Sequence, residues 1–172
     1  MPELNATQGS LLGFLHDGPR TGWDLLQAAE AGLDRFWNIT SSHVYRELRT
    51  LEDRGLVRAS SPGPRDRRPY TITAAGRRAF RTWLHDDPAP EQIRFPLLVR
   101  LWFGRHLEPE TLRTFLERDR KEREARLALY REVEPDVHDE RRAAVVRFGI
   151  AYEEAVVAWL DDTARRNLPG DA

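Results

Sequence analysis

Between residues 40 and 54 the apolar positions recur at the spacing of a helix, which predicts an amphipathic helix. The apolar stripe consists of Val44, Leu48 and Leu51. Thr40 or Ser41 can accept a hydrogen bond from a free backbone amide of the first turn. Gly55 can end the helix, because glycine best tolerates the left-handed conformation of a C-terminal cap.

Directly after this helix the pattern changes to that of two short strands, over 56–60 and 70–73. The turn between them combines a Pro-Gly-Pro run at 62–64 with three arginines, Arg65, Arg67 and Arg68. A turn with this much charge cannot pack into a core, and it suits phosphate groups or a narrow minor groove. A helix followed by such a hairpin predicts a winged helix-turn-helix with a two-stranded wing.

The polar faces of helix 40–54 carry side chains that can donate hydrogen bonds to base edges or phosphates when the helix enters a major groove. These residues are Ser42, His43, Arg46, Arg49 and Thr50. Taken alone, an arginine-rich turn or an amphipathic helix is more often plain surface or plain structure. Their direct succession is more specific than either part, and it predicts binding of duplex DNA.

The remainder of the first half predicts three further helices. They are expected near 6–16, 22–33 and 74–84. A stretch rich in proline and aspartate follows at 86–90, and we take it as a domain boundary. The predicted organisation is a winged helix DNA-binding domain over 1–87 and a second domain over 88–172.

The second half is predicted to be entirely helical. Its helices are expected over 91–106, 109–134 and 138–167. The apolar residues of the last helix cover more than one stripe, so this helix needs more cover than one neighbour offers. A second copy of the chain would supply that cover, which predicts an all-α dimerisation domain. The interface residues expected are Phe95, Leu98, Phe148, Val156, Trp159 and Leu160.

Charged residues in the second half are expected to face solvent. Between 117 and 124 acidic and basic residues alternate, as on a solvated helix face with opposite charges four positions apart. The acidic pairs Glu153-Glu154 and Asp161-Asp162 are assigned to the helix surface as well. Acid–base catalysis would need burial to separate two pKa values, so solubility is the favoured role of these pairs.

Net charge changes the picture only when it is divided along the chain. The whole chain carries −1, but residues 40–84 hold ten basic and four acidic residues, a net charge of +6. Positive charge therefore gathers where the phosphates of DNA would lie.

Several function classes lack their signatures. The chain has no cysteine, and none of its five histidines lies three or four positions from another. Phosphate-loop, dinucleotide-binding and nucleophile-elbow motifs are absent from the sequence. We expect no enzymatic activity, no cofactor and no metal. With no signal-peptide pattern or membrane-spanning run, a cytoplasmic protein without membrane contact is expected.

A dense series of short motifs runs through residues 7–84. They are Leu11-Leu12-Gly13-Phe14-Leu15 followed by Gly18-Pro19, Thr21-Gly22-Trp23-Asp24-Leu25, His43-Val44-Tyr45-Arg46-Glu47-Leu48 with Leu51-Glu52, Gly55-Leu56-Val57, and Tyr70-Thr71-Ile72-Thr73-Ala74-Ala75-Gly76. Together they resemble the PadR family of transcriptional regulators. The resemblance implies that helix 40–54 is the recognition helix and that 56–73 is the wing.

The resemblance also implies roles for single residues. Tyr45 stands where the family's recognition-helix tyrosine meets the DNA backbone, and Trp23 stands where the family usually has a tyrosine. An indole N–H would then replace a phenol as the donor to phosphate. The run Ser41-Ser42-His43 replaces a commoner Pro-Gly-Thr-like turn, which bears on base preference and not on the fold. PadR-like proteins are dimers through C-terminal helices, and 101–116 and 147–160 resemble the longer dimer module of one branch.

The expected function is that of a sequence-specific transcriptional repressor that occupies a palindromic promoter site as a homodimer. Because some members of the family sense aromatic compounds, the resemblance further implies release by a small aromatic effector. The pocket would be lined by Trp37, Trp102 and Phe103, with core packing as the alternative role of these side chains. The alternative function is a winged-helix module that holds a protein partner and does not read DNA sequence.

Overall fold

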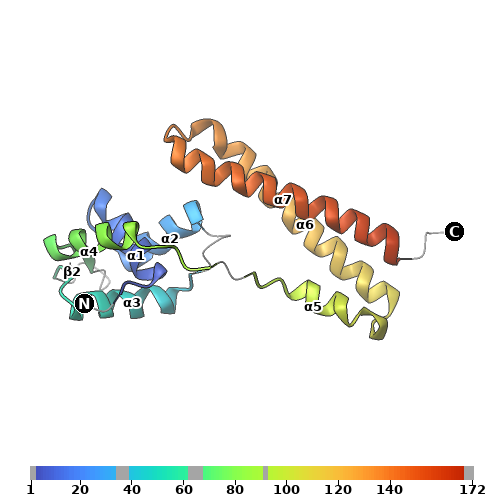
Figure 1. Ribbon diagram of the computed structural model, residues 1–172, viewed down its shortest axis with the longest axis horizontal. Helices are drawn as coiled ribbons and strands as arrows, with labels where there is room; N and C mark the ends of the chain where they lie inside the picture. The colour runs from blue at the N-terminus through green and yellow to red at the C-terminus, as the bar shows by residue number, and fades with distance from the viewer. Residues whose placement is uncertain (1–2, 34–38, 62–67, 91–92, 169–172) are drawn as a thin grey trace. The chain divides into compact units, whose positions relative to one another are not determined.

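The computed structural model describes residues 3–33, 39–61, 68–90 and 93–168 (Figure 1). Contacts divide the chain into two units, Met1–Pro90 and Glu91–Ala172. Both units are mainly helical, and the first also holds a small antiparallel sheet, so the predicted fold class is confirmed. Within the described residues, no helix combines the length and the apolar character needed to cross a bilayer.

The first unit has the element order of a winged helix-turn-helix. Its elements are α1 (Ala6–Phe14), a 3-10 turn (Leu15–Asp17), β1 (Arg20–Thr21), α2 (Gly22–Leu33), α3 (Ser41–Asp53), β2 (Val57–Ala59), β3 (Pro69–Ile72) and α4 (Ala74–His85). The strands form one antiparallel sheet in the order β1-β3-β2, with Tyr70 opposite both Arg20 and Ala59. β2 and β3 are the predicted wing strands. β1 was not predicted, because two residues are too short to show apolar alternation.

Both ends of α3 form as the sequence predicts. The Thr40 hydroxyl accepts a hydrogen bond from the backbone N–H of His43 at 3.4 Å and caps the first turn. Gly55 has a φ of +68°, the left-handed region in which glycine pays no steric penalty. The chain reverses there, and Leu56 N–H donates to Leu51 C=O at 2.8 Å, which satisfies a carbonyl at the end of the helix.

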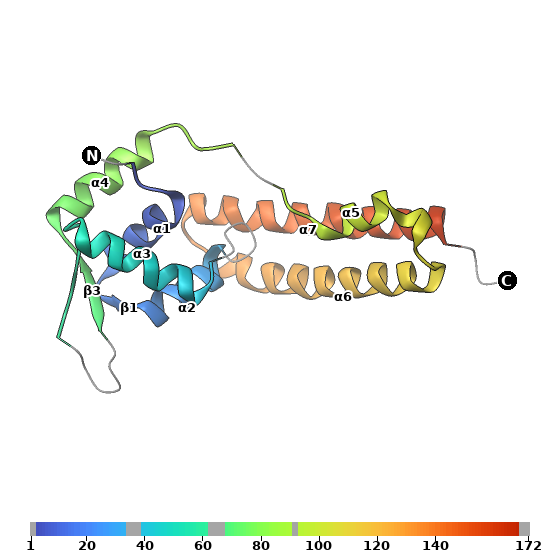
Figure 2. The same cartoon turned by 90° about the horizontal axis from the view of Figure 1, so that it is seen from below.

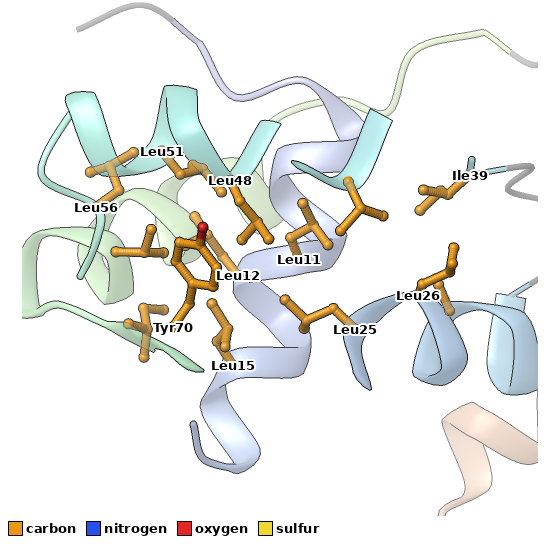
Figure 3. Packing of buried hydrophobic residues seen from close by; sticks show 14 of the residues in the cluster. Leu11, Leu12, Leu15, Leu25, Leu26, Ile39, Leu48, Leu51, Leu56 and Tyr70 are labelled. Carbon is orange, nitrogen blue, oxygen red and sulfur yellow. The ribbon is translucent and has the colours of Figure 1, made fainter. Parts of the chain in front are cut away.

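The apolar stripe of α3 lies at the centre of the first core. Figure 3 shows leucines of α1 and α2 gathered against α3, with Leu56 and Tyr70 on the hairpin side. The fully buried leucines of this unit are Leu11, Leu12, Leu15, Leu25, Leu48, Leu51 and Leu56. Burying one leucine side chain contributes about 1.5–3 kcal/mol, so this set is the main source of stability of the unit.

The second unit is built on a long helical hairpin. Its elements are α5 (Pro96–Trp102), a 3-10 turn (Gly104–His106), α6 (Pro109–Val133), a second 3-10 turn (Glu134–Asp136) and α7 (Glu140–Asn167). Figures 1 and 2 both show α6 and α7 side by side along most of their length. α5 is shorter than the helix predicted over 91–106. Pro96 explains its start, since a residue before proline is excluded from the helical region and Phe95 has φ −116° and ψ 97°.

Most of the charged middle of α6 faces solvent as predicted, and Arg120 pairs with Glu124 four positions on, at 2.9 Å between Nη1 and Oε2. Asp119 and Arg123 are more enclosed. Glu153 of α7 is only 1% exposed, so its assignment to the surface was wrong. Arg126 Nε donates to Glu153 Oε1 at 2.9 Å and Arg123 Nη1 donates to Glu153 Oε2 at 3.2 Å. Arg123 also pairs with Asp119, at 3.6 Å between Nε and Oδ2. Asp119, Arg123 and Arg126 follow helical spacing, so a charged stripe here takes the place of an apolar one.

Aromatic rings enclose the Arg123 guanidinium. The guanidinium carbon lies 4.9 Å from the centre of the Phe95 ring and 5.6 Å from that of Tyr152. Burial by itself would lower the pKa of Arg123, but Glu153 and Asp119 outweigh this effect and raise the pKa overall. The segment before α5 is thus held to the helical hairpin through a cation.

We expect Gly76→Ala to destabilise the first unit by about 1–3 kcal/mol, because its new Cβ would lie 2.1 Å from the Leu56 carbonyl oxygen, a backbone atom with little freedom to move. The measurement is chemical denaturation of the full chain. Gly104→Ala is the control, since a Cβ there meets nothing within 4 Å. Equal stability of the two variants would contradict the close approach of α4 to Leu56.

A second prediction compares two neighbouring glutamates. Glu153→Ala should destabilise the protein by roughly 3–5 kcal/mol, because it leaves two buried guanidinium groups without their shared carboxylate. Glu154→Ala should cost at most about 1 kcal/mol, since its pair with Arg131 is exposed to solvent. Thermal and chemical denaturation would measure both, and similar losses would argue against a buried ion cluster.

Candidate nucleic-acid interface

Burial of the apolar stripe of α3 decides which side chains point outward. Ser41, Ser42, His43 and Arg49 are exposed, and Thr50 is half-buried. Ser42, Arg46 and Arg49 follow one another at four and three positions, so they share one helix face. The structure therefore brings together the predicted base-reading residues of α3 on its outer side. The Thr50 hydroxyl is partly occupied, since it donates to the Arg46 carbonyl at 3.2 Å.

Tyr45 packs over the start of α2. A Cβ added at Gly22 would lie 2.5 Å from Cε1 of the Tyr45 ring, so the ring occupies the space that any larger residue at position 22 would need. Trp23 is the next residue, and both aromatic side chains are about half exposed. The two predicted phosphate-contacting residues thus lie at one junction between α2 and α3. Sequence reasoning assigned no role to Gly22, although its place directly before Trp23 was a usable signal.

A capping box fixes the start of α2 beneath Tyr45. The Thr21 N–H and hydroxyl both donate to Asp24 Oδ2, at 3.0 and 2.8 Å. The Asp24 N–H donates back to Thr21 Oγ1 at 3.2 Å. These bonds satisfy free amides of the first turn, and the negative charge lies at the favourable end of the helix dipole.

Glu47 is a buried carboxylate on α3 that sequence reasoning overlooked. It is 7% exposed, and its Oε2 accepts hydrogen bonds from Gln8 Nε2 at 2.8 Å and from Asn5 Nδ2 at 3.3 Å. Its Oε1 accepts from Arg46, whose Nε and Nη2 lie 3.1 and 3.0 Å away. Burial alone would raise the pKa of Glu47. The hydrogen bonds from Gln8, Arg46 and Asn5 and the charge of Arg46 outweigh burial, and they hold the pKa below its usual value.

The hairpin beside α3 presents further basic side chains. Arg68 is exposed, whereas Arg65 and Arg67 lie outside the described residues. Arg58 is also exposed on β2, opposite Thr71 of β3, and it is a further candidate that we did not predict. The Ala59 N–H donates to Oε1 of Glu52 at 3.2 Å, which ties β2 to α3. A hydrogen bond from the backbone of β2 to a side chain of α3 therefore joins the hairpin to this helix.

The predicted effector and dimer residues fall mostly in the second unit. Trp37 lies outside the described residues. Trp102 is 84% exposed, and Phe103 lines an open hollow whose walls all come from the segment 93–107.

Two of the six predicted dimer residues, Leu98 and Phe148, are exposed. The other four, Phe95, Val156, Trp159 and Leu160, belong to the core of their own chain. The centres of the Phe95 and Trp159 rings lie 5.7 Å apart.

No group of three or more potential metal ligands lies together in the described part of the chain.

Known proteins match both units. The Transcriptional regulator PadR-like family matches residues 11–82, and the family Virulence activator alpha C-term matches residues 93–166. Negative transcriptional regulator PadR of Bacillus subtilis is 26% identical over 69% of this chain and 68% of its own. A probable transcriptional regulator of Mycobacterium tuberculosis is 25% identical over 90% of this chain and 94% of its own.

Solved structures agree with these matches in fold. Bacillus subtilis PadR in complex with operator DNA has a TM-score of 0.76 at 22% identity, over 94% of this chain and 99% of that one. The same protein in complex with p-coumaric acid has a TM-score of 0.72 at 21% identity, over 94% of this chain and 98% of that one.

The depressed pKa of Glu47 predicts a pH dependence of stability. Because the folded state holds the carboxylate charged, the unfolding free energy should fall as the pH drops below the usual value of 4.5 and through the lower pKa of the folded state. Glu47→Gln should be less stable than the wild type at neutral pH by about 1–3 kcal/mol. Its free energy of unfolding should also change less over this acidic range. The measurement is urea denaturation between neutral and acidic pH. Glu122→Gln, on the exposed surface of α6, is the control, and parallel pH curves for the wild type and Glu47→Gln would contradict the prediction.

Proposed function

Because the chain belongs to the PadR-like family of DNA-binding transcriptional regulators, we propose that it is a repressor that occupies a palindromic promoter site as a homodimer. The family is one of regulators and not of enzymes. A repressor must reach the chromosome, and the cytoplasmic location expected from the sequence fits this requirement.

The outer face of α3 is the observation that carries the proposal. Its serine, histidine and arginine side chains are exposed on a helix whose opposite stripe is completely buried. Such a helix can enter a major groove while its buried stripe stays in the core. Its hydrogen-bond donors match the acceptors on guanine and on phosphate. The net charge of +6 over residues 40–84 attracts DNA to this part of the chain.

Apolar exposure in the second unit supports a homodimer. Large apolar side chains of one short segment lie open to solvent, more than an isolated soluble unit usually shows. They are Ile93, Leu98, Val99, Trp102 and Phe103. A second copy related by a two-fold axis would cover such surface and would also present two recognition helices to a palindromic site.

An aromatic effector is the second part of the proposal. Bacillus subtilis PadR has been solved in complex with p-coumaric acid, a planar aromatic compound. In this chain the exposed ring of Phe103 borders the hollow along 93–107, with Trp102 beside it in sequence. A ligand that acts here should both quench tryptophan emission and weaken DNA binding. A panel of aromatic compounds in which none does both would contradict effector control.

The test of the whole proposal is binding to a fragment from upstream of the protein's own gene and to a random fragment, at two salt concentrations. Phosphate contacts make affinity fall steeply with salt, whereas an apolar protein interface responds little. We expect selective retardation of the upstream fragment and a footprint of two half-sites. Absence of binding to either fragment at low salt would favour the protein-interaction module.

Replacing single arginines should separate base reading from phosphate contact. Arg49→Ala should weaken the selected site by about 1–3 kcal/mol and leave random DNA nearly unchanged, if Arg49 contacts guanine. Arg68→Ala, like loss of Arg67, should weaken all sequences alike and reduce the salt slope by about 0.9. Arg141→Ala, an exposed site of α7, is the control. Equal losses on both DNAs from Arg49→Ala and Arg68→Ala would remove the reading role of α3.

A further inference from the structure

Arg46 is held by a neighbouring carboxylate before any DNA is present. Its side chain is 65% exposed, yet its Nε and Nη2 both donate to Glu47 Oε1. These bonds occupy one edge of the guanidinium. The end of the group, with the Nη1 hydrogens and one Nη2 hydrogen, makes no hydrogen bond to another described residue. That end carries the parallel donors that a bidentate contact to guanine O6 and N7 requires.

Glu47 is itself fixed from behind by α1. Its other oxygen accepts from Gln8 and Asn5, so both carboxylate oxygens have donors. Gln8 Oε1 in turn accepts from Arg54 Nη1 at 2.9 Å. A continuous chain of hydrogen bonds therefore runs from the C-terminal cap of α3 through α1 to Arg46. Since Gln8 and Glu47 are buried and both carboxylate oxygens have donors, the carboxylate has little freedom to turn.

The ion pair with Glu47 also weakens the electrostatic attraction of Arg46 to phosphates. A lone arginine on a recognition helix attracts any phosphate, whatever the base sequence. A carboxylate 3.0 Å away cancels most of that attraction and leaves the directional hydrogen bonds to a base edge.

We propose that Glu47 is a positioning residue for base reading, which holds Arg46 in a base-contacting orientation and suppresses its contact with phosphates. This inference rests on the proposed DNA-reading function, and it adds a specificity-determining residue that does not touch DNA. Arg46 reads the base, and the anchored carboxylate restricts the orientations that Arg46 adopts.

The experiment compares the wild type, Arg46→Ala, Glu47→Gln and the double variant. The probes are a duplex that the wild type selects from a random pool, the same duplex with single base-pair changes, and a random duplex. Glu47→Gln should lower discrimination at one base pair by about tenfold, the scale of one bidentate contact. Binding of the random duplex should be unchanged or tighter, with a salt slope steeper by about 0.9, because a released arginine is free to bind phosphate. In the Arg46→Ala background the same change should have no effect on discrimination.

Two further variants test whether Glu47 acts by positioning Arg46 or only through its negative charge. Gln8→Leu removes the shorter of the two hydrogen bonds that anchor Glu47 but keeps the carboxylate, so discrimination should fall while the salt slope stays as in the wild type. Asp53→Asn removes an exposed acidic charge from the same helix and should leave discrimination intact. Thermal unfolding of each variant confirms that it is folded at the assay temperature.

Several results would overturn the inference. One is unchanged discrimination in Glu47→Gln. Another is an equal loss on selected and random DNA, which would indicate a purely structural role. A third is the same loss of discrimination with and without Arg46. If the wild type selects no duplex at all, the proposed function fails instead, and the two failures are therefore distinguishable.

Discussion

Burial of one stripe of α3 is the constraint on which the first unit depends. Val44, Leu48 and Leu51 are completely enclosed by leucines of α1, α2 and the hairpin. A helix that rotated about its axis would expose these side chains, at about 1.5–3 kcal/mol for each large one. The orientation of the outer face follows directly. The same leucines that hold the unit together thus present Ser42, Arg46 and Arg49 to solvent.

Each unit also buries a carboxylate, and in both cases arginine is among its partners. Glu47 receives hydrogen bonds from α1 and from Arg46, and Glu153 receives them from Arg123 and Arg126. A buried charge without partners would be too costly to retain, so these contacts specify the arrangement of the helices around them. In the first unit this polar contact adds to an extensive leucine core. In the second it joins two helices near the middle of a long hairpin.

The two units differ in how they treat large apolar residues. In the first, the described leucines of the core are almost all enclosed. In the second, several large apolar side chains near α5 stay exposed while Leu97, Leu112, Leu116 and Leu160 form a small core. This difference supports the proposal that the second unit offers apolar surface to a second copy of the chain.

Local signals in the sequence determined the winged helix-turn-helix. The stripe of α3, Gly55 and the wing strands show in residues close together in the chain, and each was correctly predicted. The cap is Thr40, one of the two residues that the sequence offered. The start of α5 was missed, although the rule for a residue before proline is local. Only the tertiary structure revealed that Glu47 and Glu153 are buried, because Gln8, Arg123 and Arg126, which bond to them, lie on other helices. It also decided that Tyr45 covers Gly22, a contact between segments whose separation along the chain carries no information about their distance in space.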